Sequence, residues 1–351
     1  MTGASIPAPD AHDSIALGRL PAPAEPPAGG DWPEDRPRRI VTPRSAADRV
    51  FRGVLRCAGV AVLVITGLIA LFLILRAGGA LRKAGPSFFT TQSWIPAANR
   101  FGIAAVLPDG AIIAIIALAI AVPVALGTAV FISEYAPVRL RRTLIAVVDL
   151  MAAVPSIIYG LWGVFFLQPR VIGSIRWVAE NLGFIPVFRV RGEHTSSSFT
   201  TSTFIAGLVV SLMVIPIIAS ICREVFSQAP VGEREAAYAL GANRWGMVRT
   251  VVLPYGRGGI IGATMLGFGR AMGETIAIAL IVSPTYLLAT HIFENSGMSI
   301  AALIALRYQE STPEMLSALM AAGLVLFLIT LLVNALASIV VSRSRSGAET
   351  E

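Results

Sequence analysis

The sequence contains few residues of the kinds that bind metals or nucleotide phosphates. Its 351 residues include two cysteines, three histidines and a single lysine, Lys83. Cys57 and Cys222 provide neither a disulfide framework nor the spacing of metal ligands, so reduced thiols and no metal site are expected. The chain also lacks the Gly-x-x-x-x-Gly-Lys-Ser/Thr phosphate loop, which excludes ATP binding by that route.

Charged residues are scarce as well. They make up 14% of the chain and apolar residues 55%, whereas ordinary soluble domains have roughly 25% and 45–50%. A soluble protein could not bury this much apolar surface, so the composition indicates a protein that lies in a bilayer. The formal charge is +7. The arginines lie between apolar runs and form no surface stripe, so nucleic acid is not an expected partner.

Six apolar segments follow one another along the chain. Each has about 20 residues or more, enough for a helix to cross about 30 Å of hydrocarbon. Helices satisfy their own backbone hydrogen bonds, which lipid cannot do, so the sequence predicts an all-α membrane protein with six transmembrane helices. The predicted spans are residues 54–75, 110–133, 144–167, 203–222, 258–283 and 315–341.

The remaining segments are expected to be tails and loops. Residues 1–50 are rich in proline, alanine, glycine and charge, which predicts a disordered cytoplasmic tail. A transmembrane domain is predicted over residues 51–345, followed by a C-terminal tail at 346–351. The outer loop 168–202 is either a plain connector or a docking site for an extracytoplasmic partner.

The arginine distribution predicts the orientation of the spans. Arginines are concentrated in residues 1–53, 139–142, 223–257 and 343–345. Such an excess is typical of cytoplasmic loops. The sequence therefore predicts a multi-pass protein of the cytoplasmic membrane with both termini in the cytoplasm.

The inner loop at residues 223–257 has a helix–turn–helix pattern. Its fixed positions are Glu235-Ala236-Ala237, Gly241 and Val251-Val-Leu-Pro254. Arg234–Leu240 has good helix formers, and Gly241 can end that helix with a positive φ. Arg244–Val252 can form a second short helix, which Pro254 is expected to stop.

This spacing resembles the EAA loop of binding-protein-dependent ABC importers, whose permease subunits have the type I ABC importer permease fold. In that family the loop forms a coupling helix that fits a cleft on the ATPase subunit. The resemblance implies that Glu235, Ala236, Ala237 and Gly241 take this role here. It also implies that the chain is not an enzyme and binds no cofactor, because the partner subunit binds and hydrolyses ATP.

The fifth predicted span carries an arginine and a glutamate. Arg270 falls near its midpoint, where insertion scales give a cost of about 2.5–3.5 kcal/mol. Glu274 follows four positions later, which would put both side chains on one helix face. The guanidinium suits an oxyanion, and a carboxylate can accept a hydrogen bond from protonated phosphate but repels sulfate. The pair fits either a phosphate path or a buried salt bridge.

Further segments resemble PstC-type phosphate ABC permeases. They are Arg270-Ala-Met-Gly-Glu-Thr275, Ala152 to Gly163, Ser133-Glu-Tyr-Ala-Pro137, and Trp94-x-Pro96 with Phe101-Gly102. The resemblance covers about residues 50–345 and implies an ATP-driven phosphate importer that works by alternating access, with Arg270, Glu274 and Thr275 on the phosphate pathway. It implies three partners: a PstA-like second permease subunit, a PstB-like ATPase dimer and a PstS-like phosphate-binding protein.

Other functions and contacts stay open at this stage. The alternatives are a permease for another oxyanion such as sulfate or molybdate, an ATP-independent channel or secondary transporter, and a phosphate-sensing membrane component. Among the other polar residues of the spans, Asp149 is expected to pair with Arg141 or Arg142. Asn334 and Ser211 are expected to make interhelical hydrogen bonds.

Overall fold

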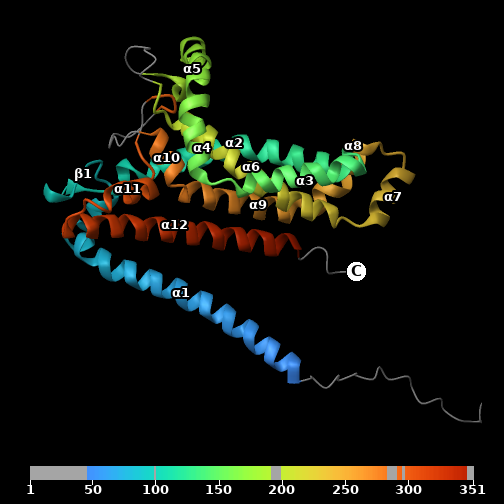
Figure 1. The fold of residues 1–351 in the computed structure, drawn as a ribbon, viewed down its shortest axis with the longest axis horizontal. Coiled ribbons are helices and arrows are strands. Elements are labelled where there is room, and N and C mark those ends of the chain that lie inside the picture. The colour runs from blue at the N-terminus through green and yellow to red at the C-terminus, as the bar shows by residue number, and fades with distance from the viewer. Residues whose placement is uncertain (1–45, 99, 191–198, 283–290, 295–296, 346–351) are drawn as a thin grey trace, which may run out of the picture. The chain divides into compact units, whose positions relative to one another are not determined.

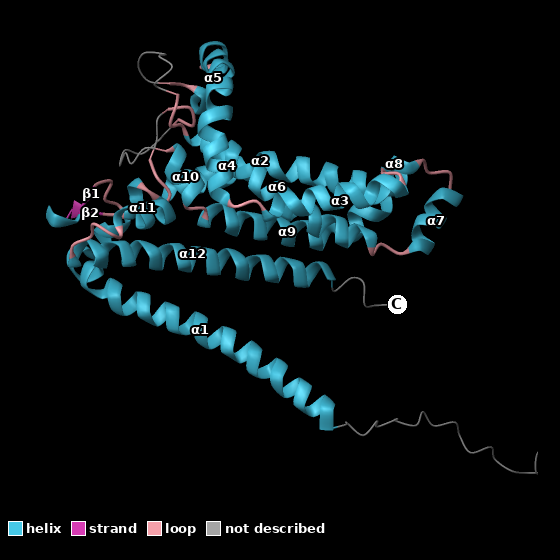
Figure 2. Ribbon diagram, viewed as in Figure 1, coloured by secondary structure: helices cyan, strands magenta, loops and turns pink. Residues whose placement is uncertain are grey.

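The computed structural model describes residues 46–98, 100–190, 199–282, 291–294 and 297–345. Most of the predicted tail at 1–50 and all of that at 346–351 lie outside these ranges. The described part is almost entirely helical (Figure 2). It divides into two units, Met1–Val60 and Ala61–Glu351, and the contacts that follow are those of the second.

Long helices alternate with short turns along the chain. The α-helices are α1 (Ala46–Ala84), α2 (Leu107–Val130), α3 (Val138–Ala153), α4 (Ser156–Trp162), α5 (Gln168–Leu182), α6 (Thr203–Ser227), α7 (Val231–Ala239), α8 (Arg244–Met247), α9 (Leu253–Gly273), α10 (Ile276–Ile281), α11 (Ile300–Arg307) and α12 (Pro313–Arg345). The 3-10 turns are η1 (Gly85–Phe89), η2 (Pro96–Ala98), η3 (Ile103–Ala105) and η6 (Pro186–Phe188). The π turns are η4 (Phe131–Tyr135), η5 (Gly163–Leu167) and η8 (Val248–Val252).

Helix α6 lies at the centre of the second unit, against α2 and α9 (Figure 1). Its apolar side chains are buried along most of its length. Small residues bring its neighbours close: a buried alanine face of α2 runs from Ala114 to Ala129. On α9, a Cβ added to Gly267 would lie 2.8 Å from both Ile218 and Val214. Tight helix contacts through small residues are the main source of helix association in membranes.

Helices cover all six predicted apolar segments, but two of the segments are broken. Within the described residues, four helical stretches are long and apolar enough to cross a membrane, or up to five if the bent pair Val138–Ala153 and Ser156–Leu182 forms one span. The expected count of six transmembrane helices is therefore not confirmed. Many large apolar side chains on α1, α3, α4 and α12 are exposed, as expected for a multi-pass protein in contact with lipid.

The third predicted segment bends by 90° between α3 and α4. Val154 and Pro155 have extended ψ angles of 128° and 140°. A residue before proline is pushed out of the helical region by the proline ring, which explains why α3 ends there.

Helix α5 occupies part of the outer segment that was expected to be a loop. It follows α4 through η5 and buries Ile175 and Ala179. Apolar residues recur along it with helical spacing, at Val171, Ile172, Ile175, Val178, Ala179 and Leu182. This periodicity could have predicted the helix.

A short hairpin precedes α2 and is the one extended element of the described chain. Strands β1 (Trp94–Ile95) and β2 (Arg100–Phe101) are antiparallel, with Trp94 opposite Phe101. Phe88 and Trp94 pack edge-to-face on Phe101. A Cβ on Gly102 would lie 2.5 Å from the Thr91 carbonyl oxygen, so only glycine fits at the end of the hairpin.

The contact between α4 and α10 predicts a stability effect. A Cβ on Gly160 would lie 3.0 Å from the Ala277 Cα atom, and overpacking of this kind costs about 1–3 kcal/mol. We expect Gly160→Leu to lower the free energy of unfolding by that amount in denaturant titrations of the detergent-purified protein. Gly173→Leu is the matched control, because a Cβ there meets nothing within 4 Å. Equal transitions for the two variants would contradict this packing.

Candidate functional site

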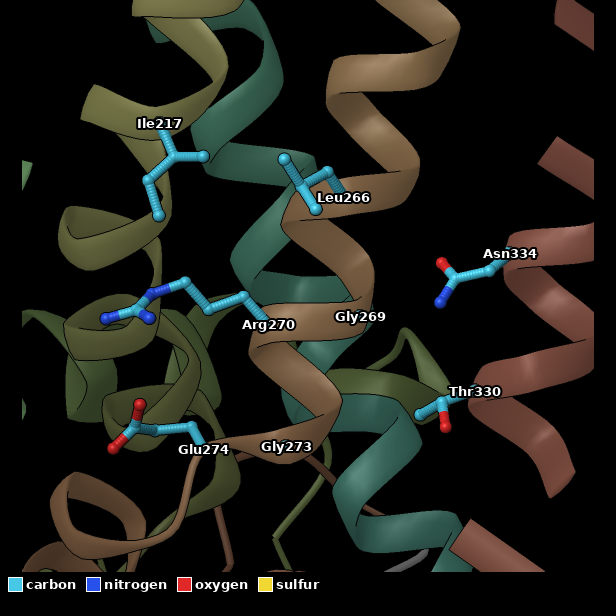
Figure 3. Close-up of a pocket in the computed structure, with 8 residues that line it drawn as sticks. All are labelled: Ile217, Leu266, Gly269, Arg270, Gly273, Glu274, Thr330 and Asn334. Carbon is cyan, nitrogen blue, oxygen red and sulfur yellow. The ribbon is translucent and has the colours of Figure 1, made fainter. Parts of the chain in front are cut away.

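A cavity of about 570 Å³ opens beside the C-terminal end of α9 (Figure 3). It is lined by α6, α9 and α12 and by the residue that follows α9. Its lining residues are Ile217, Leu266, Gly269, Arg270, Gly273, Glu274, Thr330 and Asn334. Arg270 and Glu274 extend to one side of α9 at this cavity, and the uncharged polar residues Thr330 and Asn334 lie on α12 at its other side (Figure 3). Intramembrane ionisable groups of this kind usually mark a substrate or ion pathway.

Arg270 lies in the last turn of α9, with its side chain exposed to the cavity. Within the described residues its guanidinium forms no ion pair. A buried salt bridge with Glu274, the alternative left open by the sequence, is therefore not formed in this structure. An arginine without a counter-charge in an apolar setting is costly unless water or a ligand reaches it.

Glu274 follows directly after α9 and is not part of it. The helix ends at Gly273, and Glu274 has extended backbone angles of φ −66° and ψ 129°. The prediction of one uninterrupted helix over residues 258–283 is therefore wrong, because Glu274 lies just beyond the helix that carries Arg270. Glycine is a poor helix former, and the Glu274 side chain supports the break because its Oε1 accepts a hydrogen bond from the Ala277 N–H at 3.3 Å.

The break nevertheless leaves both charged side chains on one side of α9 (Figure 3). Glu274 is only 7% exposed. The Ser299 hydroxyl donates to its backbone carbonyl at 3.3 Å, which satisfies an acceptor that the helix end leaves open. The carboxylate thus has a fixed position beside the guanidinium, with one backbone contact of its own.

Thr275 faces a different space. It lines a neighbouring cavity of about 530 Å³, whose other lining residues are almost all apolar, and its hydroxyl donates to the Gly273 carbonyl at 3.1 Å. Gly273 and Thr330 border both cavities. The structure therefore brings together Arg270 and Glu274, and it separates Thr275 from them.

Helix α12 contributes two polar residues that sequence reasoning did not assign to the site. Asn334 and Thr330 extend from α12 toward α9 at Gly269 (Figure 3). A Cβ at Gly269 would lie 3.8 Å from the Asn334 Oδ1 atom, so the glycine leaves this side open. A lone asparagine in an otherwise apolar helix is the signal in the sequence that could have found it.

Three expected contacts of polar residues are not formed. Among the described residues, Asn334 makes no side-chain hydrogen bond and Asp149 no ion pair. The Ser211 hydroxyl donates to the Leu208 carbonyl of its own helix. Arg141 donates instead to the carbonyls of Ile132, at 2.9 Å, and Ser133. Backbone carbonyls released at the end of α2 thus take the place of the expected carboxylate.

The inner loop forms a second candidate surface, at α7 and α8. Gly241 has φ +85°. The Gly241 N–H donates to the Tyr238 carbonyl, and the Ala242 N–H donates to the Ala237 carbonyl. These two bonds form a Schellman motif, which ends α7 as predicted. Asn243 caps α8 through the Gly246 N–H at 2.7 Å.

Pro254 does not stop the second helix as expected. Residues from Arg244 onward continue through the π turn η8 into α9, with Pro254 in the first turn of α9. The wider π turn relieves the clash that a proline ring makes with the preceding turn. The candidate coupling segment and the helix that carries Arg270 are therefore joined without a break.

The surface of this segment is largely without partners in the described chain. Glu235, Ala236 and Gly241 are exposed. Leu240 is 90% exposed and Trp245 56%. Exposed apolar side chains grouped with a carboxylate are typical of a surface that another protein covers.

Comparison with known proteins shows similarity over most of the chain. Residues 121–346 match the family described as binding-protein-dependent transport system inner membrane component. The phosphate transport system permease protein PstC 2 of Mycobacterium tuberculosis is 42% identical over 85% of this chain and 92% of that protein. The PstC protein of Mesorhizobium japonicum is 35% identical over 90% and 98%.

A solved structure also matches most of the chain. A chain from a bacterial ABC transporter involved in the import of the acidic polysaccharide alginate is 18% identical, with a TM-score of 0.49 over 84% of this chain and 99% of that one.

The position of Asn334 predicts a water-accessible cavity. In a chain whose Cys57 and Cys222 are replaced by alanine, we expect Asn334→Cys to react with a membrane-impermeant maleimide at least about tenfold faster than Leu332→Cys, because a thiol ionises in water and not in lipid. Leu332 is an exposed apolar residue of the same helix. Equal labelling rates would mean that the cavity holds no water.

Proposed function

The chain belongs to the family of binding-protein-dependent transport system inner membrane components, and we propose that it carries inorganic phosphate through the cytoplasmic membrane. In this role it is the PstC-type permease subunit of an ATP-driven importer. Its all-helical, multi-pass structure and its relatives of more than 35% identity, named as phosphate permeases, support this function.

The observation that carries the proposal is that the Arg270 guanidinium, which has no ion-pair partner in the described part of the chain, lies beside the Glu274 carboxylate (Figure 3). Arginine binds oxyanions through a planar set of donors. Near neutral pH phosphate keeps at least one proton, which it can donate to a carboxylate. Phosphate can therefore satisfy both side chains at once, whereas fully ionised sulfate meets repulsion from Glu274.

Alternating access requires that the path open to each side in turn. We assign Arg270 and Glu274 to the path, with Asn334 as an uncharged donor on the facing helix. Thr275 has a secondary role next to the break, since its hydroxyl supports the Gly273 carbonyl. The break after Gly273 resembles the discontinuous helices that line substrate sites in other transporters, where irregular backbone is tolerated beside a water-filled path.

The energy is supplied by other subunits in this proposal. The exposed surface that includes Glu235, Ala236, Ala237 and Gly241 docks a PstB-like ATPase dimer. A PstA-like permease subunit completes the path, and a PstS-like binding protein delivers phosphate from outside. Both termini of the chain then lie in the cytoplasm.

Charge removal at the cavity tests the phosphate path. In vesicles containing the complete complex, we expect Arg270→Ala and Glu274→Gln each to lower ATP-dependent phosphate uptake by roughly 10- to 100-fold, the loss of one charge-assisted contact. The glutamine introduced by Glu274→Gln keeps an oxygen that can accept from the Ala277 N–H, so the fold is preserved. Arg307→Ala, at a partly exposed position of α11, is the control.

Two results would count against this proposal. Excess sulfate that competes with phosphate for uptake by the wild-type complex would indicate a general oxyanion permease. Variants that no longer assemble in the membrane would assign the two side chains to structure.

The positive φ of Gly241 predicts an effect on coupling. A β-branched residue in the left-handed region costs about 1–2 kcal/mol or more, so Gly241→Val should distort the end of α7. We expect ATP hydrolysis to continue while phosphate uptake per ATP falls several-fold. Gly232→Val, in α7 with equally open surroundings, should keep the wild-type ratio. A normal ratio in Gly241→Val would contradict the docking role of this turn.

A further inference from the structure

A buried ion pair ties α7 to the cytoplasmic end of α2. Arg234 Nη1 lies 3.0 Å from Glu134 Oε2, and the side chains are only 20% and 5% exposed. Arg234 is the residue before the Glu235-Ala236-Ala237 pattern, on the side of α7 that faces the membrane helices. The same guanidinium donates through Nη2 to the Phe226 carbonyl at 2.5 Å, at the end of α6. One side chain thus holds three elements together.

The turn that carries Glu134 is a junction for other contacts. Glu134 belongs to the π turn η4, in which the helical bonds are irregular. The Arg244 guanidinium of α8 lies over the ring of the next residue, Tyr135, at 5.5 Å. Arg141, at the start of α3, donates to the Ile132 and Ser133 carbonyls of the same turn. The turn therefore contacts both short helices of the inner loop.

The contacts continue from this junction to the helix of the cavity. The Phe226 ring packs against α9, where a Cβ on Gly256 would lie 2.5 Å from it. One turn further, a Cβ on Gly259 would lie 2.5 Å from Val225. Helix α9 then runs unbroken to Arg270 and Gly273. Packed chains of this kind can carry a displacement from one site to another.

A buried ion pair is a poor source of net stability but is costly to break from one side. The remaining atoms reinforce this: Glu134 Oε1 and Arg234 Nε are buried without hydrogen-bond partners among the described residues. A pair whose polar atoms are incompletely satisfied is better suited to fixing the position of α7 than to raising stability.

We infer that Arg234 and Glu134 are positioning residues that lock the coupling helix α7 to α2 and α6, so that movement of α7 is delivered to α9 and Arg270. This inference rests on the proposed function, in which an ATPase moves α7. Without the lock, α7 can follow the ATPase while the membrane helices stay in place. Hydrolysis then continues without transport.

The first experiment measures phosphate uptake and ATP hydrolysis in the same vesicles containing the complete complex. For Arg234→Met and for Glu134→Gln we expect the ratio of phosphate to ATP to fall roughly tenfold, a typical size for coupling between two sites. Arg139→Met and Glu224→Gln, at exposed positions of the same cytoplasmic side, should keep the wild-type ratio.

Two further variants separate positioning from simple stabilisation. The double variant Glu134→Arg with Arg234→Glu should restore much of the wild-type ratio of phosphate transported to ATP hydrolysed, because it again places opposite charges at the two positions. Arg234→Lys should be intermediate, because a single ammonium lacks the planar fork that reaches both Glu134 and the Phe226 carbonyl. Wild-type ratios in both single variants would overturn the inference, as would loss of the assembled complex in both with no recovery by the exchange.

A second measurement does not depend on the cargo. Amide hydrogen exchange of the purified complex without nucleotide reports local opening of α7. We expect exchange over residues 231–240 to be roughly tenfold faster in Arg234→Met than in Arg139→Met. Unchanged exchange in Arg234→Met would contradict the inference that the ion pair fixes α7, even if phosphate is transported. If the wild-type complex does not transport phosphate but exchange is faster in Arg234→Met, the proposed cargo is refuted. The positioning role of the Arg234–Glu134 ion pair would then still be supported.

Discussion

Close contact between α9 and α6 is the constraint on which the rest of the molecule depends. Gly256, Gly259 and Gly267 leave no side chain between the two helices, so Phe226, Val225 and Ile218 of α6 sit directly on the α9 backbone. Lipid offers no hydrophobic drive for helix association, and contacts of this closeness supply the attraction instead. The register they fix places Arg270 in the lining of the cavity.

The same helix connects two regions with different chemistry. Its N-terminal end continues from α8 through η8, and its C-terminal end carries Arg270 and stops at Gly273. The break there is held by Glu274, which bonds to the start of α10, and by Ser299, which bonds to the Glu274 carbonyl. A continuous helix between the exposed surface at α7 and α8 and the polar break after Gly273 is an arrangement that can transmit movement without unfolding.

Irregular turns recur where the molecule changes direction or contact. The π turns η4, η5 and η8 and the extended residues at Val154, Pro155 and Glu274 interrupt long apolar helices. In a bilayer each interruption exposes backbone groups that need partners. Arg141, Tyr159 and Ser299 provide some of them by bonding to carbonyls across the breaks. Polar side chains near the breaks therefore satisfy backbone groups that the interrupted helices leave open.

The sequence by itself determined the helical membrane architecture, the turn at Gly241 and the presence of an arginine, Arg270, within an apolar segment, because hydropathy, helix propensity and charge are local properties. It did not determine that α9 stops before Glu274 or that Thr275 lines a different cavity from Arg270. Contacts between distant segments accompany such features: Ser299 bonds to Glu274 at the break, and Arg234 pairs with Glu134 at the inner loop. Residues separated by 25 and 100 positions meet only through packing, which no local pattern encodes.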